Sequence, residues 1–208
     1  MKIFVAVPCM DQVPAPFAQS LATLNRVGEC MIGFQVGSLI YDARNGLARR
    51  AIQAESDMVL WIDSDMVFNP DALQQLVETK QKTGAAIVSG LYFRRVPPFS
   101  PVLFDKLELN GKRCEWTNFE TVPDGPFEVG GCGFGFVLMD TDVLIDVFAK
   151  KGDLFGPLYG IGEDLSFCLR ARDLGYKIIC DPSIPLGHVG HTVINREFFN
   201  VYHKAGNA

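Results

Sequence analysis

The chain lacks the sequence features of several protein classes. None of its six cysteines stands in a C-x-x-C pair, which argues against a zinc ribbon or a dithiol redox motif. No N-x-S or N-x-T sequon occurs, and the N-terminal apolar run is broken at Pro8 after five residues, too short for a secretory signal. We therefore interpret the cysteines as small buried apolar residues in a reducing compartment, and we expect a cytoplasmic protein.

Positive charge is also scarce and dispersed. The 208 residues include 19 Lys and Arg against 24 Asp and Glu, the formal net charge is −5, and no basic run exceeds two residues. We therefore expect neither nucleic acid nor an anionic membrane surface as a partner. No apolar run approaches the length of a membrane span, so no integral membrane segment is expected.

What the sequence does contain is an alternation of strand and helix patterns. With 48% hydrophobic residues the chain can bury the core of one large domain. Strands are expected at residues 2–8, 31–36, 57–63 and 85–92. Helices are expected at residues 17–28, 42–55 and 71–83, the last with Asn69 as its cap, Pro70 at its first position and Gly84 at its end. This order predicts an α/β fold with a mainly parallel sheet and helices on its faces.

The second half of the chain has a different texture. Residues 93–129 are rich in proline and in short alternating runs, which predicts loops and short, largely antiparallel strands. The segment GGCGFGFVLMD (130–140) is interpreted as a Gly-rich turn into a strand. Helices that end at Gly152 and Gly175 follow, and then a last strand in KIICDP. Beyond His191 there is no clear pattern.

The stretch VLWIDSDMVFNP (59–70) contains the first candidate site. Strand interiors disfavour Asp, yet Asp63 and Asp65 follow an apolar strand with only Ser64 between them. If the strand continues through Ser64, both carboxylates point the same way, at the sheet edge where ligands bind in open α/β folds. Two such acids suit Mg²⁺ or Mn²⁺, which in turn suits a diphosphate. The alternative is a local turn in which Asp65 caps or hydrogen-bonds its own backbone.

Several motifs occur in an order that resembles a known family. VAVPCMDQVPAPFAQSLATL, ARNGLARRAIQAESDMVLWIDSDMVFNPDALQQLV, GGCGFGFVLMD and GEDLSFCLRARDLGYKIICDP together resemble the small, family-2-like, nucleotide-sugar-dependent glycosyltransferases of the GT-A fold. The resemblance covers nearly the whole length and implies a GT-A-like (Rossmann-like) mixed, mainly parallel sheet with a smaller antiparallel part in the second half. It implies a single domain, residues 1–208, with a nucleotide-binding half at 1–92 and an acceptor-binding half at 93–208.

The resemblance assigns the D-x-D to a metal site. Asp63 and Asp65 would hold Mn²⁺ or Mg²⁺ on the diphosphate of a UDP- or GDP-sugar, with Asp65 the more direct ligand and Ser64 beside the nucleotide. A cation at that place would stabilise the charge that develops on the departing nucleoside diphosphate. His188 would supply a third ligand, and His191 is the reserve candidate. The alternative for either histidine is a side chain with no ligand role.

The E-D pair would provide the catalytic base. The resemblance implies that Asp164, beside Glu163, removes the proton of an acceptor hydroxyl, which is a poor nucleophile until deprotonated. An Asp base favours inversion at the anomeric carbon. The alternative is structural, because acids in the first turn of a helix favour the positive end of its dipole. Both roles can hold together.

The resemblance implies further nucleotide and sugar contacts. Arg44 and Asn45 match an R-N pair that lies against the nucleotide, and Pro8 would border the base. Gly131 and Gly133 would allow close approach of a donor or acceptor sugar. The alternatives are a surface arginine, a helix-capping asparagine and a plain turn. GGCGFGF has no G-x-G-x-x-G spacing and no G-K-[ST], so neither a dinucleotide site nor a P-loop is expected.

Departures from the family leave other interpretations open. An Asp that would hold uracil is missing after the second strand, since Asp42 comes late, so the base stays undetermined. The acceptor is expected to be a glycan, a lipid-linked group or a protein, and this short chain could need a partner or a homo-oligomer to recognise it. IDSDMVF also fits haloacid-dehalogenase-type phosphotransferases with Asp63 as nucleophile. A non-catalytic sugar-nucleotide or glycan-binding protein is the third alternative.

Overall fold

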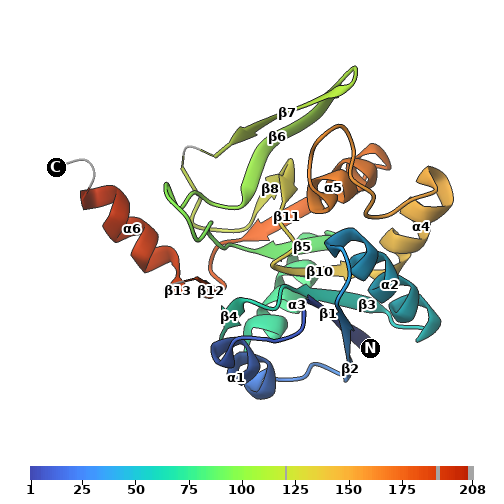
Figure 1. The fold of residues 1–208 in the computed structure, drawn as a ribbon, viewed down its shortest axis with the longest axis horizontal. Helices are drawn as coiled ribbons and strands as arrows, with labels where there is room; N and C mark the ends of the chain where they lie inside the picture. The colour runs from blue at the N-terminus through green and yellow to red at the C-terminus, as the bar shows by residue number, and fades with distance from the viewer. Residues whose placement is uncertain (120, 191–192, 206–208) are drawn as a thin grey trace.

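A sheet of seven strands runs through the centre of the computed structural model, which describes residues 1–119, 121–190 and 193–205 (Figure 1). Its strand order is β2-β1-β3-β10-β5-β11-β8. The strands are β1 (Lys2–Cys9), β2 (Glu29–Val36), β3 (Met58–Ile62), β5 (Ile87–Gly90), β8 (Phe127–Val129), β10 (Phe136–Asp140) and β11 (Ile178–Asp181). Strand β1 pairs in parallel with β2 and β3, and β5 with β11, whereas β10 and β8 run antiparallel to their neighbours. The predicted mixed α/β sheet is confirmed.

Helices cover both faces of this sheet. They are α1 (Ala15–Thr23), α2 (Ile40–Gln53), α3 (Ala72–Thr83), α4 (Thr141–Lys151), α5 (Glu163–Asp173) and, away from the sheet, α6 (Arg196–Ala205). Side chains alternate along a strand, so Trp61 of β3 lies in one core cluster with Leu47 of α2 and Phe167 of α5. Its neighbour Leu60 lies in the other cluster, with Phe17 of α1. Helices α2, α4 and α5 therefore cover one face, and α1 and α3 the other.

Two small antiparallel sheets flank the central one. One contains β6 (Leu103–Asn110), β7 (Arg113–Asn118) and β9 (Gly131–Cys132), and the other contains β4 (Met66–Phe68), β12 (Leu186–Val189) and β13 (Val193–Ile194). The hairpin of β6 and β7 projects from the body (Figure 1). The antiparallel part expected in the second half of the chain is thus present, and it extends to β4 in the first half.

The first helix ends earlier than the sequence predicts. It ends at Thr23, not at Gly28, because the residues that follow hydrogen-bond to the segment just before α3. The Asn25 amide nitrogen donates to the carbonyl oxygen of Pro70 at 2.9 Å, and its side-chain Nδ2 donates to Asp71 Oδ1 at 2.6 Å. These tertiary hydrogen bonds replace the last turn of the expected helix.

The third helix begins later than expected. The prediction of Asn69 as its cap is wrong, because residues 69–71 form a turn and α3 starts at Ala72 without a side-chain cap. Asn69 contributes its backbone carbonyl instead, which accepts from the Ala72 nitrogen at 3.1 Å. The predicted end is confirmed, since Gly84 takes a left-handed conformation with φ of 70°.

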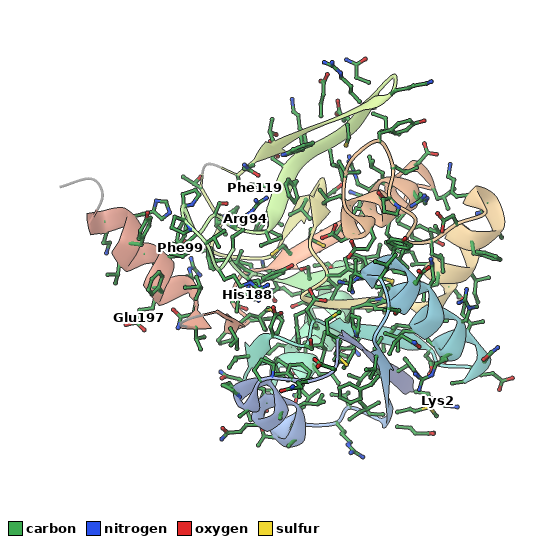
Figure 2. All side chains as sticks on the ribbon, in the orientation of Figure 1. Lys2, Arg94, Phe99, Phe119, His188 and Glu197 are labelled. Carbon is green, nitrogen blue, oxygen red and sulfur yellow. The ribbon has the colours of Figure 1, made fainter. Side chains whose placement is uncertain are left out.

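Helix α6 was not predicted, although its apolar residues have helical spacing. It packs on the loop that follows β5. Figure 2 shows Phe99 beside α6. The ring of Phe99 packs against those of Phe198 and Tyr202 with centroid separations of 5.0 and 4.7 Å. The ring of Phe93 stacks on Phe199 at 4.6 Å. These partners come from a distant part of the sequence, so the apolar spacing of α6 could not be interpreted from the local sequence alone.

The described residues also bear on the prediction for the cysteines and on that for membrane segments. Cys132, Cys168 and Cys180 are buried, as expected, but Cys9, Cys30 and Cys114 are only half-buried; all are free thiols. Within residues 1–119, 121–190 and 193–205, every helix is too short or too polar to cross a membrane.

Candidate active site

The D-x-D segment forms a turn at the end of a central strand. Strand β3 ends at Ile62, and the Met66 nitrogen donates to the carbonyl oxygen of Asp63 at 3.1 Å as the chain turns into β4. The expectation that both acids point the same way required the strand to continue through Ser64, and it does not. Asp63 therefore turns toward α2, whereas Asp65 turns toward β12.

A cavity of about 460 Å³ lies at this edge of the sheet. It is lined by Pro8, Cys9, Met10, Ser38, Ile40, Ala43, Arg44, Asp63, Ser64, Asp65, Arg95, Glu163, Asp164 and His188. The lining comes from the carboxyl ends of β1 and β3, the first turns of α2 and α5, the loop after β5, and β12. The fold thus gathers most of the predicted site residues, although they are widely separated in sequence.

Asp65 and His188 form the open end of the site. Asp65 Oδ2 lies 3.3 Å from His188 Nε2 and 2.6 Å from Arg95 Nη1. The carbonyl oxygen of Phe93 accepts from His188 Nδ1 at 2.9 Å, which leaves Nε2 directed at Asp65. Burial tends to raise the pKa of Asp65, but the hydrogen bond and charge of His188 and the charge of Arg95 outweigh it and lower that pKa.

The imidazole of His188 responds in the opposite sense. Burial tends to lower its pKa, while the hydrogen bonds to Asp65 and to the Phe93 carbonyl raise it above the ordinary value. Asp65 and His188 therefore stabilise each other in their charged forms. A carboxylate beside an imidazole whose other nitrogen is held by a backbone carbonyl is also a common arrangement of metal ligands.

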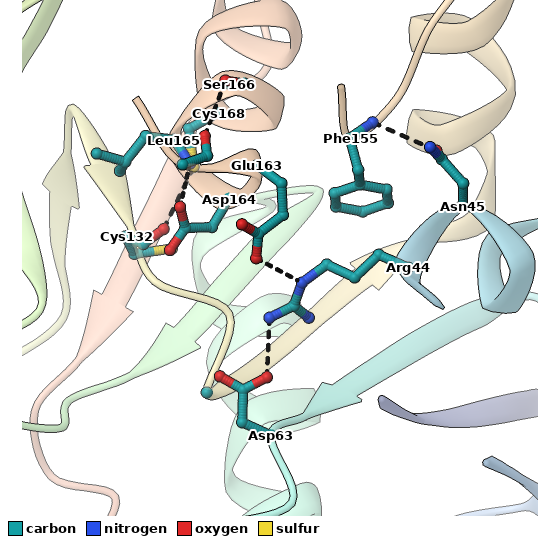
Figure 3. A network of polar contacts seen from close by, with 12 residues as sticks. Arg44, Asn45, Asp63, Cys132, Phe155, Glu163, Asp164, Leu165, Ser166 and Cys168 are labelled. Atoms are coloured by element: carbon teal, nitrogen blue, oxygen red, sulfur yellow. Dashed lines mark hydrogen bonds and ion pairs between the residues drawn. The ribbon is translucent and has the colours of Figure 1, made fainter. Parts of the chain in front are cut away.

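Asp63 and Glu163 share one buried arginine (Figure 3). Arg44 Nη2 donates to Asp63 Oδ1 at 2.8 Å, and Arg44 Nε donates to Glu163 Oε1 at 3.1 Å. Burial raises the pKa of Asp63, and the nearby Arg44 charge only partly offsets this effect. Both acids line the cavity and both are paired with basic side chains, Asp63 with the buried Arg44 and Asp65 with His188 and Arg95.

Asp164 stands at the first turn of α5. Its Oδ1 accepts a hydrogen bond from the Leu165 nitrogen at 2.7 Å. Burial, reinforced by the charge of Glu163, raises its pKa to about 6, against the opposing effect of Arg44. A carboxyl group with that pKa can both accept and release a proton near neutral pH. Glu163, in contrast, is committed to its ion pair with Arg44.

Three predicted contact residues lie outside the cavity lining. The carbonyl oxygen of the Asn45 side chain accepts from the Phe155 nitrogen at 3.4 Å, on the side of α2 that faces α4. Gly131 and Gly133 are buried, and their Cα atoms face the side chains of Leu107 and Tyr92 respectively. Their predicted ligand contacts stay predictions. The reserve candidate His191 lies outside the described residues.

Arg95 lines the cavity but was not among the residues predicted for the site. It is the second of two adjacent arginines in the loop that follows β5, and its side chain reaches both Asp65 and the carbonyl oxygen of Val189, the latter at 3.3 Å. The available signal was a pair of basic residues at the carboxyl end of a buried strand. That signal is weak because an arginine pair in a loop is ordinarily exposed to solvent.

The side chains of this cavity can hold a divalent ion only as an open site. Within the part of the chain that is described, no group of three or more His, Cys, Asp and Glu side chains converges as a closed metal site. Asp65 and His188 offer an open pair with oxygen and nitrogen ligands. Mg²⁺ and related ions commonly use one or two carboxylates and take their other ligands from water and substrate phosphates. The residues present fit such an open site.

The mixed, mainly parallel sheet with helices on both faces and small antiparallel sheets beside it is a GT-A-like fold, and solved structures agree. "A197 from STIV" superposes with a TM-score of 0.66 at 19% identity, over 91% of this chain and 85% of that one. GalNAc-T7, solved with UDP, GalNAc and Mn²⁺, superposes with a TM-score of 0.64 at 10% identity, over 91% of this chain and 44% of that one. At these identities the likeness concerns the fold alone.

The chain belongs to glycosyl transferase family 2, whose family model matches residues 40–148. It is thus a glycosyltransferase, and the haloacid-dehalogenase alternative is set aside. The matched segment contains Asp63 and Asp65 and ends before Glu163 and His188. No curated protein sequence matches the chain.

Proposed function

We propose that this enzyme moves a sugar from a UDP- or GDP-sugar to an acceptor hydroxyl, with a divalent metal ion and with inversion of the anomeric carbon. The observation that carries the proposal is that Asp65 and His188 line the same cavity as Asp164. A metal-and-diphosphate side and a proton-accepting side thus face one space. The presence of UDP and Mn²⁺ in the GalNAc-T7 structure supports this arrangement by analogy of fold.

The two halves of the single domain would divide the substrates. Residues 1–92 would hold the nucleotide, and residues 93–208 would hold a glycan, lipid-linked or protein acceptor. The cavity supports this division, because Pro8 and Ser38 line it from the first half and Asp164 from the second. A homo-oligomer and a cytoplasmic location remain part of the proposal.

Asp65 and His188 would hold Mn²⁺ or Mg²⁺, and Asp63, which lines the same cavity, would add its charge while paired with Arg44. When bound, such an ion supplies positive charge to the departing diphosphate, which stabilises the transition state more than the ground state. The lowered pKa of Asp65 suits this role because the group stays a carboxylate throughout the neutral range. His188 would orient its Nε2 through the hydrogen bond that Nδ1 makes with the Phe93 carbonyl.

Asp164 would be the general base. Above a pH of about 6 it is mostly ionised, so it can take the proton from an acceptor hydroxyl as the oxygen attacks the anomeric carbon. Attack from the side opposite the departing diphosphate inverts that carbon. Glu163 would assist by its negative charge, which raises the pKa of its neighbour and makes Asp164 a stronger base.

A panel of nucleotide sugars tests the proposal. The wild-type chain is incubated with each UDP- and GDP-sugar, with and without Mn²⁺, and nucleoside diphosphate release is measured alongside thermal shift. We expect at least one donor to bind and turn over only with metal. Asp65→Asn should abolish the increase in turnover that Mn²⁺ produces. Asp164→Asn should retain donor binding while turnover falls ~10²–10⁴-fold. Donor binding without turnover by the wild type would instead favour the non-catalytic alternative.

A further inference from the structure

Arg44 is an enclosed cation beside an open cavity. Its side chain is 2% exposed, whereas Arg95, the other arginine of the lining, is 51% exposed. The guanidinium carbon of Arg44 lies 5.8 and 5.3 Å from the ring centroids of Trp61 and Phe134. An arginine that has given up this much water depends on fixed protein partners, so those partners indicate its role.

The partners of Arg44 come from two separate parts of the fold. Asp63 directly follows β3 and precedes Asp65 by two positions. Glu163 is the first residue of α5, directly before Asp164, and is 119 positions from Arg44 in the sequence. One guanidinium therefore links the turn that presents Asp65 to the helix start that presents Asp164 (Figure 3).

We propose that Arg44 is a positioning residue, which holds the Asp164 side of the site at a fixed distance from the Asp65 side, and that it is not a ligand of the donor phosphates. The inference rests on the proposed function, in which those two acids serve the acceptor and the metal. A displacement of ~1 Å between reacting groups can cost on the order of 10²-fold in rate. Arginine suits the role because its planar fork meets two acids at once, whereas a lysine ammonium is a point charge.

The competing role for Arg44 is the one that the sequence pattern favours, contact with the nucleotide. Its Nη1 is buried and has no hydrogen-bond partner among the residues that the structure describes, so a phosphate oxygen is a candidate partner. The two roles separate in kinetics. Loss of a phosphate contact weakens donor binding, whereas loss of positioning lowers kcat and leaves ground-state donor binding intact.

The test is the substitution Arg44→Lys. The dissociation constants of UDP and GDP in the presence of Mn²⁺ are measured by calorimetry, and kcat is measured at saturating donor sugar. We expect Kd to stay within ~3-fold of wild type while kcat falls ~10–100-fold. Arg50→Lys is the matched control on the same helix, because Arg50 bonds the Phe34 carbonyl away from the cavity, and it should change neither quantity. A Kd weakened ~10-fold or more with unchanged kcat would overturn the proposal.

Glu163→Asp breaks the same link from the other side by shortening the side chain, and it keeps the negative charge beside Asp164. If the link is the shared cause, the double variant should be about as slow as the slower single variant, since the link can be lost only once. Rate losses that multiply would overturn the proposal. Should Arg44→Lys fail to fold, unchanged Kd with reduced kcat in Glu163→Asp supports the positioning role, and unchanged kcat rejects it. A wild-type chain that binds neither UDP nor GDP overturns the proposed function and this inference with it.

Discussion

Arg95 Nη1 and Asp65 Oδ2 lie 2.6 Å apart in the cavity, at the carboxylate oxygen that also faces His188 Nε2. The acid expected to carry a divalent ion is thus already paired with a side-chain cation. Arg95 is half-exposed and extends from the loop that α6 holds through Phe93 and Phe99, so its guanidinium can leave Asp65 without disturbing the core. This pairing leads to the first prediction.

Replacing Arg95 by alanine should strengthen metal binding. The ion pair is exposed, so its worth is ~0.2–1 kcal/mol, and its loss should lower the Kd of Mn²⁺ by about 1.4–5-fold. Calorimetric titration of the donor-free chain with Mn²⁺ measures this. Arg94→Ala, at the exposed neighbouring arginine, is the control and should leave the Kd unchanged. Weaker Mn²⁺ binding in Arg95→Ala would show that Arg95 does not compete with the ion for Asp65.

Turnover should depend on pH through Asp164. Its pKa of about 6 places the loss of the proton within the accessible range, and only the carboxylate can accept the hydroxyl proton. We therefore expect kcat/KM to fall roughly tenfold per pH unit below about 6 and to level off above it. The pH–rate profile of the wild type, compared with the residual activity of Asp164→Asn, checks this. A wild-type acid limb that persists in Asp164→Asn would assign the ionisation to another group.

The same carboxyl should make folding stability depend on pH. The folded-state pKa of about 6 lies above the ordinary value of 3.8 for an aspartate, so the folded chain binds the proton more tightly than the unfolded chain. This contribution is complete below about pH 4 and is lost as the pH rises toward and through 6. Asp164→Asn should therefore stabilise the protein at pH 7.5 by on the order of 1–3 kcal/mol, with little effect at pH 4. Urea unfolding at the two pH values measures the difference, and equal effects at both would refute it.

Trp61 offers a test of the buried core beneath the site. The side chain is fully buried, and its Nε1 has no hydrogen-bond partner among the residues that the structure describes. Trp61→Phe removes that unpaired donor, which offsets part of the cavity cost, so we expect a loss of only ~0–2 kcal/mol. Trp61→Ala should lose ~3–5 kcal/mol. Chemical denaturation of both variants gives the comparison, and a phenylalanine as costly as alanine would mean that Nε1 is satisfied in the folded protein.

Local patterns predicted the central elements well. Strand β3 is set by its own apolar run, and the end of α3 is set by Gly84. Both signals are local, and the structure confirms both predictions. Boundaries set by distant partners were missed. The end of α1 depends on the hydrogen bond from Asn25 to the Pro70 carbonyl, and α6 depends on aromatic rings of the loop after β5. Neither partner is visible in a local window.

The sequence by itself determined the α/β alternation, the acids that follow β3 and the acids that open α5, because strand and helix periodicity and residue chemistry act over a few positions. Only the tertiary structure decided which charges meet. The strand ends before Ser64, so Asp63 and Asp65 point in different directions. Asp63 pairs with the buried Arg44, and Asp65 pairs with His188 and Arg95. Such pairings depend on where the sheet brings distant segments together, and burial then sets their strength, since charges removed from water interact far more strongly than charges in it.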